Sequence, residues 1–206
     1  MSYCLRMSTG DMRQVIRLLT SVERTDDQER VLESVRQHCR ERDARHTHEG
    51  VRRRLTVEQA LEELLDGTPG SDMGAEYTYA FDALVSRHFS DPVDLGAWRR
   101  PSWFYAMDAE LAGCGVPSAL RPGDFLFAGP PIRLPHPGDA FPSIGTLATD
   151  LAGQLADAYE AVLHRLAPEF QNTAQHFAKL MRFEAEEWAH AKARGRTEDT
   201  IYFFFT

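Results

Sequence analysis

The residues with the clearest potential for chemistry are a glutamate and a histidine near the end of the chain. Glu187-Trp188-Ala189-His190 has the Glu-x-x-His spacing with which helix bundles hold a pair of iron or manganese ions. Glu160 and His164 on the preceding predicted helix would be the partners in a metal-dependent oxidase. At 100° per residue, however, all four side chains fall away from the apolar stripes of their helices, whereas ligands of a buried metal face the interior. We therefore predict no metal and no other cofactor.

Two other side chains are candidates for a catalytic acid and base. Glu184 falls inside the apolar sector of its predicted helix, where partial desolvation raises a carboxyl pKa unless the group is paired. The structural alternative is an ion pair with an arginine at the rim of the core. His88 lies on the apolar face of a helix predicted from about 72 to 89, where a hydrogen-bonded core histidine is the alternative to a catalytic one. The sequence contains no G-x-S-x-G, P-loop, G-x-G-x-x-G or H-E-x-x-H motif.

A mixture of arginine and aromatic residues marks a first candidate binding surface. It occupies residues 98–105, and the three residues we select from it are Trp98, Arg99 and Trp103. Such mixtures are enriched at binding hot spots. The alternative is local packing at a helix entry, with arginine stacked on tryptophan.

A proline-rich segment is the second candidate surface. Seven of the eleven prolines lie between residues 113 and 145, where the helical period disappears, and we expect an ordered, extended segment there. Prolines restrict φ and remove backbone donors, so the part from Pro130 to Pro142 should run in polyproline-like form. Ile132, Leu134 and Phe141 would anchor it. The side chains that would then point outward are Arg133, His136 and Asp139.

The elements that position these residues are mostly helices. Helical spacing predicts helices over about 11–19, 26–46, 56–66, 72–89, 101–112, 145–166 and 168–193. Thr56 with Gln59 forms a capping box, and Gly67 ends that helix. Short strands are expected at Tyr3–Met7 and Ile201–Phe205. The second is apolar on both faces, so it should be an interior strand.

Composition limits the classes of partner. The net charge is −8, with 12 basic against 9 acidic residues up to position 55 (+3) and 11 against 22 beyond it (−11). An acidic body of this kind repels phosphate backbones, so we predict no nucleic acid partner. Three cysteines form no C-x-x-C pair, and no secretory segment is recognisable at the start. The longest apolar run has five residues, Ile201–Phe205, so we expect a soluble cytoplasmic protein without a membrane partner.

Four stretches resemble a known family. They are Met1-Ser2-Tyr3, GAEYTYAFDAL at 74–84, PIRLPHPGDAFPSIG at 131–145 and YFFF at 202–205. They are similar to an uncharacterised bacterial family, mainly from high-GC bacteria, that is known only as a domain of unknown function. The resemblance spans nearly the whole chain and implies a single domain over residues 1–206. It brings no activity, ligand or catalytic residue with it.

Together these patterns predict an α+β fold that is mostly helical, with six or seven helices and a small sheet containing the N- and C-terminal strands. The leading functional hypothesis is a protein-binding or regulatory protein, with immunity proteins as one possible type. The alternative is a cofactor-independent enzyme that acts on a small molecule through buried groups such as His88 and Glu184. The partner is accordingly expected to be another protein or a small molecule.

Overall fold

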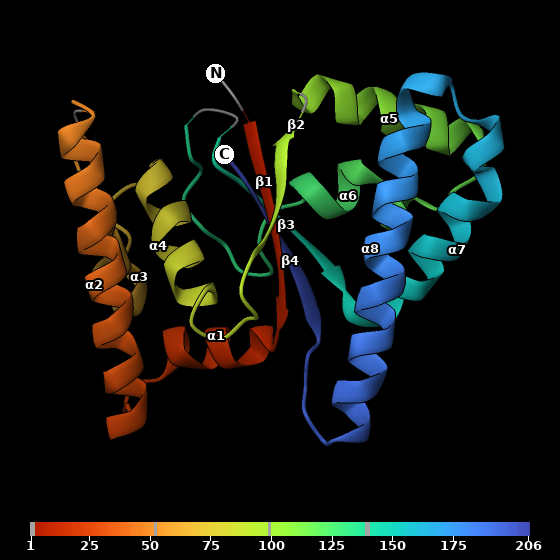
Figure 1. Ribbon diagram of the computed structural model, residues 1–206. Helices are drawn as coiled ribbons and strands as arrows, with labels where there is room; N and C mark the ends of the chain where they lie inside the picture. Colours follow the sequence, from red (N-terminus) through yellow and green to blue (C-terminus); the bar gives the residue numbers. More distant parts are fainter. Residues whose placement is uncertain (1–2, 52, 99, 139–140) are drawn as a thin grey trace. The chain divides into compact units, whose positions relative to one another are not determined.

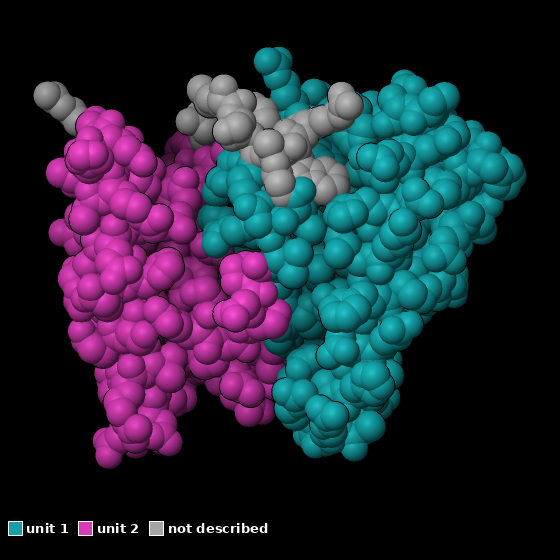
Figure 2. Space-filling model, in the orientation of Figure 1, with its two compact units in different colours: residues 1–10, 93–129, 144–206 teal, residues 11–92, 130–143 magenta. Residues whose placement is uncertain are grey.

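The structure is a computed structural model that describes residues 3–51, 53–98, 100–138 and 141–206. The chain separates into two compact units, which Figure 2 distinguishes by colour. Unit 1 comprises residues 1–10, 93–129 and 144–206, and unit 2 comprises residues 11–92 and 130–143. Each unit is thus assembled from separate stretches of the chain. The expected single domain stays a prediction.

A four-stranded sheet in the order β2-β1-β4-β3 organises unit 1 (Figure 1). Its strands are β1 (Tyr3–Gly10), β2 (Val93–Trp98), β3 (Ser143–Ala148) and β4 (Thr200–Phe205). β1 pairs antiparallel with β2, and also with β4, where Leu5 lies opposite Phe205 and Met7 opposite Phe203. β4 therefore has a neighbour on each side, which confirms the prediction of an interior strand.

Helices pack on this sheet through aromatic side chains. The helices of unit 1 are α5 (Pro101–Gly113), α6 (Pro122–Phe127), α7 (Ala152–Val162) and α8 (Pro168–Ala193), with 3-10 turns at Ser118–Leu120, Thr149–Leu151 and Leu163–Arg165. The ring of Phe203 lies 5.3 Å from that of Phe125 on α6, which in turn lies 5.6 Å from Phe177 on α8. Phe205 meets Phe104 of α5 edge to face at 5.9 Å. All five side chains are buried, so one face of the sheet and three helices share a single aromatic core.

Unit 2 consists of four helices within residues 11–92 and of the separate segment 130–143. Its helices are α1 (Met12–Thr20), α2 (Asp26–His48), α3 (Val57–Leu65) and α4 (Ala75–Val85). Thr56 and Gln59 form the predicted capping box at the start of α3, and Gly67 follows its end with φ 68°. Asp43 adds a second tie, because its carboxylate accepts the backbone N–H of Val57 at 2.8 Å.

Arginine–carboxylate pairs connect the helices of unit 2. Arg36 of α2 donates to Glu62 of α3 at 2.7 Å, and Arg53 donates to Glu76 of α4 at 2.7 Å. The guanidinium of Arg42 lies 4.4 Å from the ring centroid of Tyr79. These pairs are part-buried, where charge-assisted bonds are stronger than at an open surface.

The fold class is therefore α+β and mostly helical, as predicted, with eight α-helices in the described part of the chain. Three elements differ from the sequence expectation. Residues 143–148 form β3 instead of a helix start, so α7 begins only at Ala152; residues 93–98 form β2; and part of the proline-rich segment, from Pro122, is the short helix α6. Leu147, Leu151 and Leu155 do have helical spacing. At Leu147, however, pairing with β4 outweighs the helical pattern, and the residue lies in β3.

Gly145 in β3 provides a test of this packing. A Cβ built there would lie 2.0 Å from the carbonyl oxygen of Phe125 and 2.5 Å from the backbone of Leu126, so any side chain collides with main chain of α6. We expect Gly145→Ala to lower the free energy of unfolding by about 3 kcal/mol or more, measured by denaturant unfolding.

Gly153 supplies the matched control. A Cβ at this position of α7 would meet only the Cβ of Ala185, at an ordinary 3.7 Å. Gly153→Ala should therefore leave stability unchanged or raise it by up to about 1 kcal/mol, because alanine is the better helix former. Equal stability of the two variants would contradict the close approach of β3 and α6.

Candidate protein-binding surface

The second half of the proline-rich segment is held against the loop before α4 by backbone hydrogen bonds. The N–H of His136 donates to the carbonyl of Asp72 at 2.8 Å, and the N–H of Gly74 donates to the carbonyl of His136 at 2.7 Å. These two bonds make a parallel bridge between Met73 and His136. The N–H of Gly138, which has φ 89°, donates to the His136 Nδ1 at 3.0 Å. Hydrogen bonds thus fix the backbone of both segments that the bridge joins, around Met73 and around His136.

The loop that carries Met73 is itself attached to α3. Glu63 accepts a short hydrogen bond from the hydroxyl of Tyr77 and another, at 2.8 Å, from the N–H of Gly70. The first of these bonds, helped by the second, holds the pKa of Glu63 below its usual value. Burial and the Glu63 contact raise the pKa of Tyr77 to about 12. The carboxylate and the phenol therefore stay in the charge states that this clamp needs across the physiological range.

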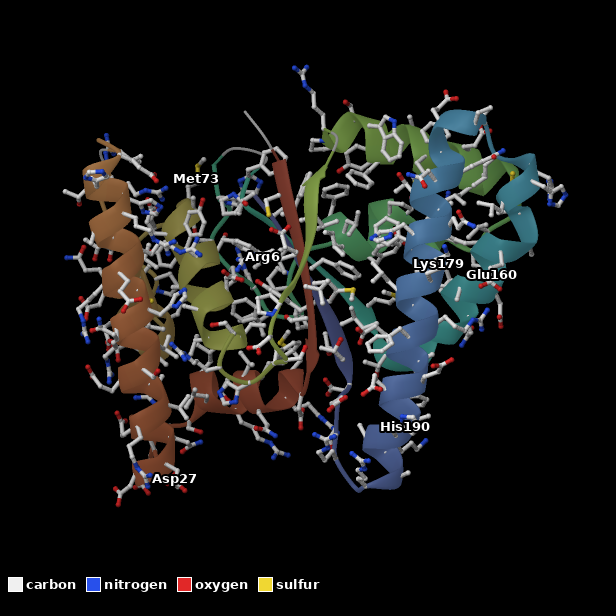
Figure 3. The ribbon with its side chains drawn as sticks, in the orientation of Figure 1. Arg6, Asp27, Met73, Glu160, Lys179 and His190 are labelled. Atoms are coloured by element: carbon white, nitrogen blue, oxygen red, sulfur yellow. The ribbon has the colours of Figure 1, made fainter. Side chains whose placement is uncertain are left out.

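Three exposed side chains project from this backbone. We call the ridge these three side chains together with the backbone of residues 72–74 and 131–138. They are Met73, which is 59% exposed, Arg133 and His136. Figure 3 shows Met73 in the loop that precedes α4. Ile132 and Leu134, which flank Arg133, are half-buried, so the predicted alternation of anchoring and outward residues is present there. Asp139, the third outward residue of the sequence prediction, lies outside the described residues.

Of the three residues selected from the arginine–aromatic stretch, Trp103 is the one whose side chain is described, and its role is structural. Trp103 is half-buried, and its ring lies 5.3 Å from that of Phe104 and 5.1 Å from that of Phe170 on α8. Its place in the aromatic core corresponds to the helix-entry alternative. Arg99 lies outside the described residues, and for Trp98 only the backbone, in β2, is described.

Glu184 is buried in unit 1, with 8% of its surface exposed. Its carboxylate accepts a hydrogen bond of 2.6 Å from the hydroxyl of Thr9 in β1. The structural alternative of an arginine partner was wrong, because the Glu184 carboxylate lies against β1, where the group within reach is the Thr9 hydroxyl. Burial raises the pKa of Glu184, the Thr9 bond opposes that shift, and the charges of Glu198 and Glu187 add to it.

His88 belongs to unit 2, so the two candidate catalytic residues lie in different compact units. α4 ends at Val85, and His88 follows in a turn where it is half-buried. Desolvation lowers its pKa against the opposing charge of Asp11, and its buried Nε2 has no hydrogen-bond partner among the described residues. The joint action of His88 and Glu184 on one substrate therefore stays a prediction.

The Glu-x-x-His residues face solvent, as their position on the helix predicted. Glu187 and His190 are both exposed on α8, and their closest approach is 3.8 Å. Glu160 on α7 instead accepts a hydrogen bond from Arg182 at 2.8 Å (Figure 3 labels Glu160 and His190). Among the described residues, no group of three or more histidine, cysteine, aspartate or glutamate side chains is arranged to hold a metal ion.

Two residues of the ridge scaffold were missed from the sequence. The sequence does contain an indication for Met73. It is an apolar residue within the turn sequence Ser71-Asp72-Met73-Gly74, where no core-facing position is available. Glu63 gives no such signal, because it looks like an ordinary surface residue of α3. Its role appears only when Tyr77 and Gly70 fold back onto it.

The comparisons with known proteins identify the family. The chain matches, over residues 1–205, the family described as a domain of unknown function (DUF7691), and it belongs to that family. Neither a curated protein nor a solved structure matches the chain. The family identification agrees with the resemblance in the sequence and assigns no activity.

The buried Glu184 predicts a specific pH dependence of stability. Because the folded pKa lies above the ordinary value of 4.5, the folded state binds the proton more tightly than the unfolded state. This group therefore stabilises the fold below pH 4.5, and that contribution is lost as pH rises through the folded pKa. Glu184→Gln can still accept the Thr9 bond and should be more stable than wild type near neutral pH, with a flatter profile.

The measurement is thermal or urea unfolding between pH 4 and 8. Glu186→Gln, an exposed neighbour on α8, is the control and should run parallel to wild type. A Glu184→Gln profile that also runs parallel to wild type would refute the assignment of a raised pKa.

Proposed function

We propose that this protein binds another protein through the ridge of unit 2 and acts as a regulatory protein. The observation that supports this most directly is the bridge between Met73 and His136, which presents exposed side chains on a fixed backbone. A surface that is already ordered loses little conformational entropy on association, so more of its contact energy remains as affinity.

The side chains of the ridge indicate the chemistry of the partner. Met73 offers a flexible thioether that adapts to apolar surfaces of different shape. Arg133 is exposed and makes no ion pair with the residues that the structure describes. A complementary partner would therefore place an apolar side chain against Met73 and a carboxylate within reach of the Arg133 guanidinium. Proteins that act as immunity or inhibitor subunits are one class with such interfaces.

The cellular location remains a prediction. Cys4, Cys39 and Cys114 are free thiols, as expected for a reducing compartment such as the cytoplasm. In the described part of the chain, we find no helix whose length and hydropathy would let it cross a membrane.

Site-specific crosslinking tests the proposal while the partner is still unidentified. A benzophenone amino acid would replace Met73 in the full-length protein, and the same group at Val22, which is 98% exposed in unit 2, would be the control. We expect a discrete protein adduct from position 73 and none from position 22 after irradiation in the native host. The adduct would identify the partner for direct affinity measurement.

The triple variant Met73→Ala, Arg133→Ala, His136→Ala then measures the contribution of the ridge. Unfolding free energy should change by less than about 0.5 kcal/mol for Met73→Ala and for Arg133→Ala, which are exposed, and by about 1 kcal/mol for His136→Ala, which also removes the hydrogen bond from Gly138. Affinity for the identified partner should fall at least tenfold, as expected for hot-spot residues. Identical adducts at positions 73 and 22, or full affinity in a stable triple variant, would overturn the proposal.

A further inference from the structure

A cleft of about 350 Å³ opens in unit 1 where α8 ends and the chain turns back into β4 (the blue segment at the lower end of α8 in Figure 1). One wall comes from α8 and the turn that follows it, with Trp188, Lys192 and Arg196. The other wall comes from the end of β3, the 3-10 turn after it and the segment before β4, and includes Asp150, Glu198 and Asp199. Its volume is within the range of small-molecule sites.

Both walls are fixed by backbone hydrogen bonds. The N–H of Arg196 donates to the carbonyl of Ala191 at 3.0 Å, which closes the C-terminal turn of α8. Across the cleft, Thr149 donates through its hydroxyl to the carbonyl of Glu198 at 2.7 Å and through its N–H to the carbonyl of Asp199 at 3.2 Å. The backbone of both walls is therefore ordered before any ligand binds.

The charges in this cleft do not neutralise one another. Lys192 and Arg196 make no ion pair with the described residues, and neither do Asp150 and Glu198, although all four line the same space. The ammonium of Lys192 instead lies 4.8 Å from the centroid of the Trp188 ring. Asp199, the third carboxylate of the lining, accepts a hydrogen bond from the hydroxyl of Thr200 at 2.9 Å, so two cations and two other anions line the cleft without direct contact between them.

We propose that this cleft binds a small zwitterion with an apolar body, of the class of short peptides with free ends. Its carboxylate would lie between Lys192 and Arg196, and its ammonium between Asp150 and Glu198. The apolar body would pack against the indole of Trp188, which is half-buried. A ligand with both charges satisfies both walls, whereas a ligand with one charge leaves the other wall without a partner.

This difference gives the site its selectivity. Charge-assisted hydrogen bonds are among the stronger polar contacts, and a site built for a charged group rejects an analogue that lacks it. Capping either end of the ligand should therefore weaken binding about tenfold or more. Because the residues involved belong to unit 1, this proposal does not depend on the ridge of unit 2.

The test uses the full-length protein and three probes: glycyl-phenylalanine with free ends, its N-acetyl form and its C-terminal amide. Titration calorimetry measures affinity, and tryptophan fluorescence compared with Trp188→Phe reports occupancy at the indole. We expect saturable binding of the free dipeptide, at least tenfold weaker binding of each capped form, and loss of the fluorescence change in Trp188→Phe.

A pair of double variants separates the site from general surface charge. The double variant Lys192→Gln, Arg196→Gln should lower the affinity for the free dipeptide at least tenfold. Lys179→Gln with Arg194→Gln removes the same charges from exposed positions outside the cleft, so it should retain full affinity. No saturable binding, equal binding of the N-acetyl form as for a simple anion site, or equal loss in both double variants would overturn the proposal.

Discussion

The burial of β4 on both faces is the constraint on which unit 1 depends. Ile201 to Phe205 are all buried, and the strand has β1 on one side and β3 on the other. The backbone of β4 therefore needs both neighbouring strands for its hydrogen bonds. Its side chains need the elements packed on both faces of the sheet for their burial. Truncating one buried phenylalanine typically costs about 3–5 kcal/mol, and Phe203 and Phe205 link the sheet to the rings of α5 and α6. The sheet and its helices thus form one cooperative structure.

Polar contacts have a larger part in unit 2. Arginine–carboxylate pairs such as Arg36 with Glu62 connect its helices, and the Glu63 clamp fixes the loop that carries Met73. These contacts are directional, so they define positions that a methionine or a proline segment could not define by hydrophobic burial alone. The ridge is consequently a feature of the clamp and the bridge together. The exposed side chains can then vary in chemistry while the backbone that presents them stays the same.

The sequence predicts the features that depend on near neighbours. The capping box at Thr56 follows from its own residues, and β4 follows from five consecutive apolar ones. It does not predict β3, because Leu147 fits a helix equally well and its strand partner is distant in the chain. The hydroxyl partner of Glu184 is 175 positions away at Thr9, so no local pattern could select it over an arginine. The outward direction of Arg133 was accessible from its flanking anchors, but the pairing of its segment with Met73 was not.

Unit 2 is made of two excursions of the chain out of unit 1. In each excursion, the residues before and after it are paired by backbone contacts within unit 1. Residues 11–92 leave after β1 and return in β2, where Met7 and Val93 are paired, while residues 130–143 leave and return beside a hydrogen bond from Gly129 to Ile144. In terms of loop-closure entropy, the cost of such an excursion rises only by about 0.6 kcal/mol for each doubling of its length. The length of either excursion therefore has only a small effect on the free energy of closing the sheet. Changes of length in unit 2 can accordingly leave the paired strands of unit 1 unchanged.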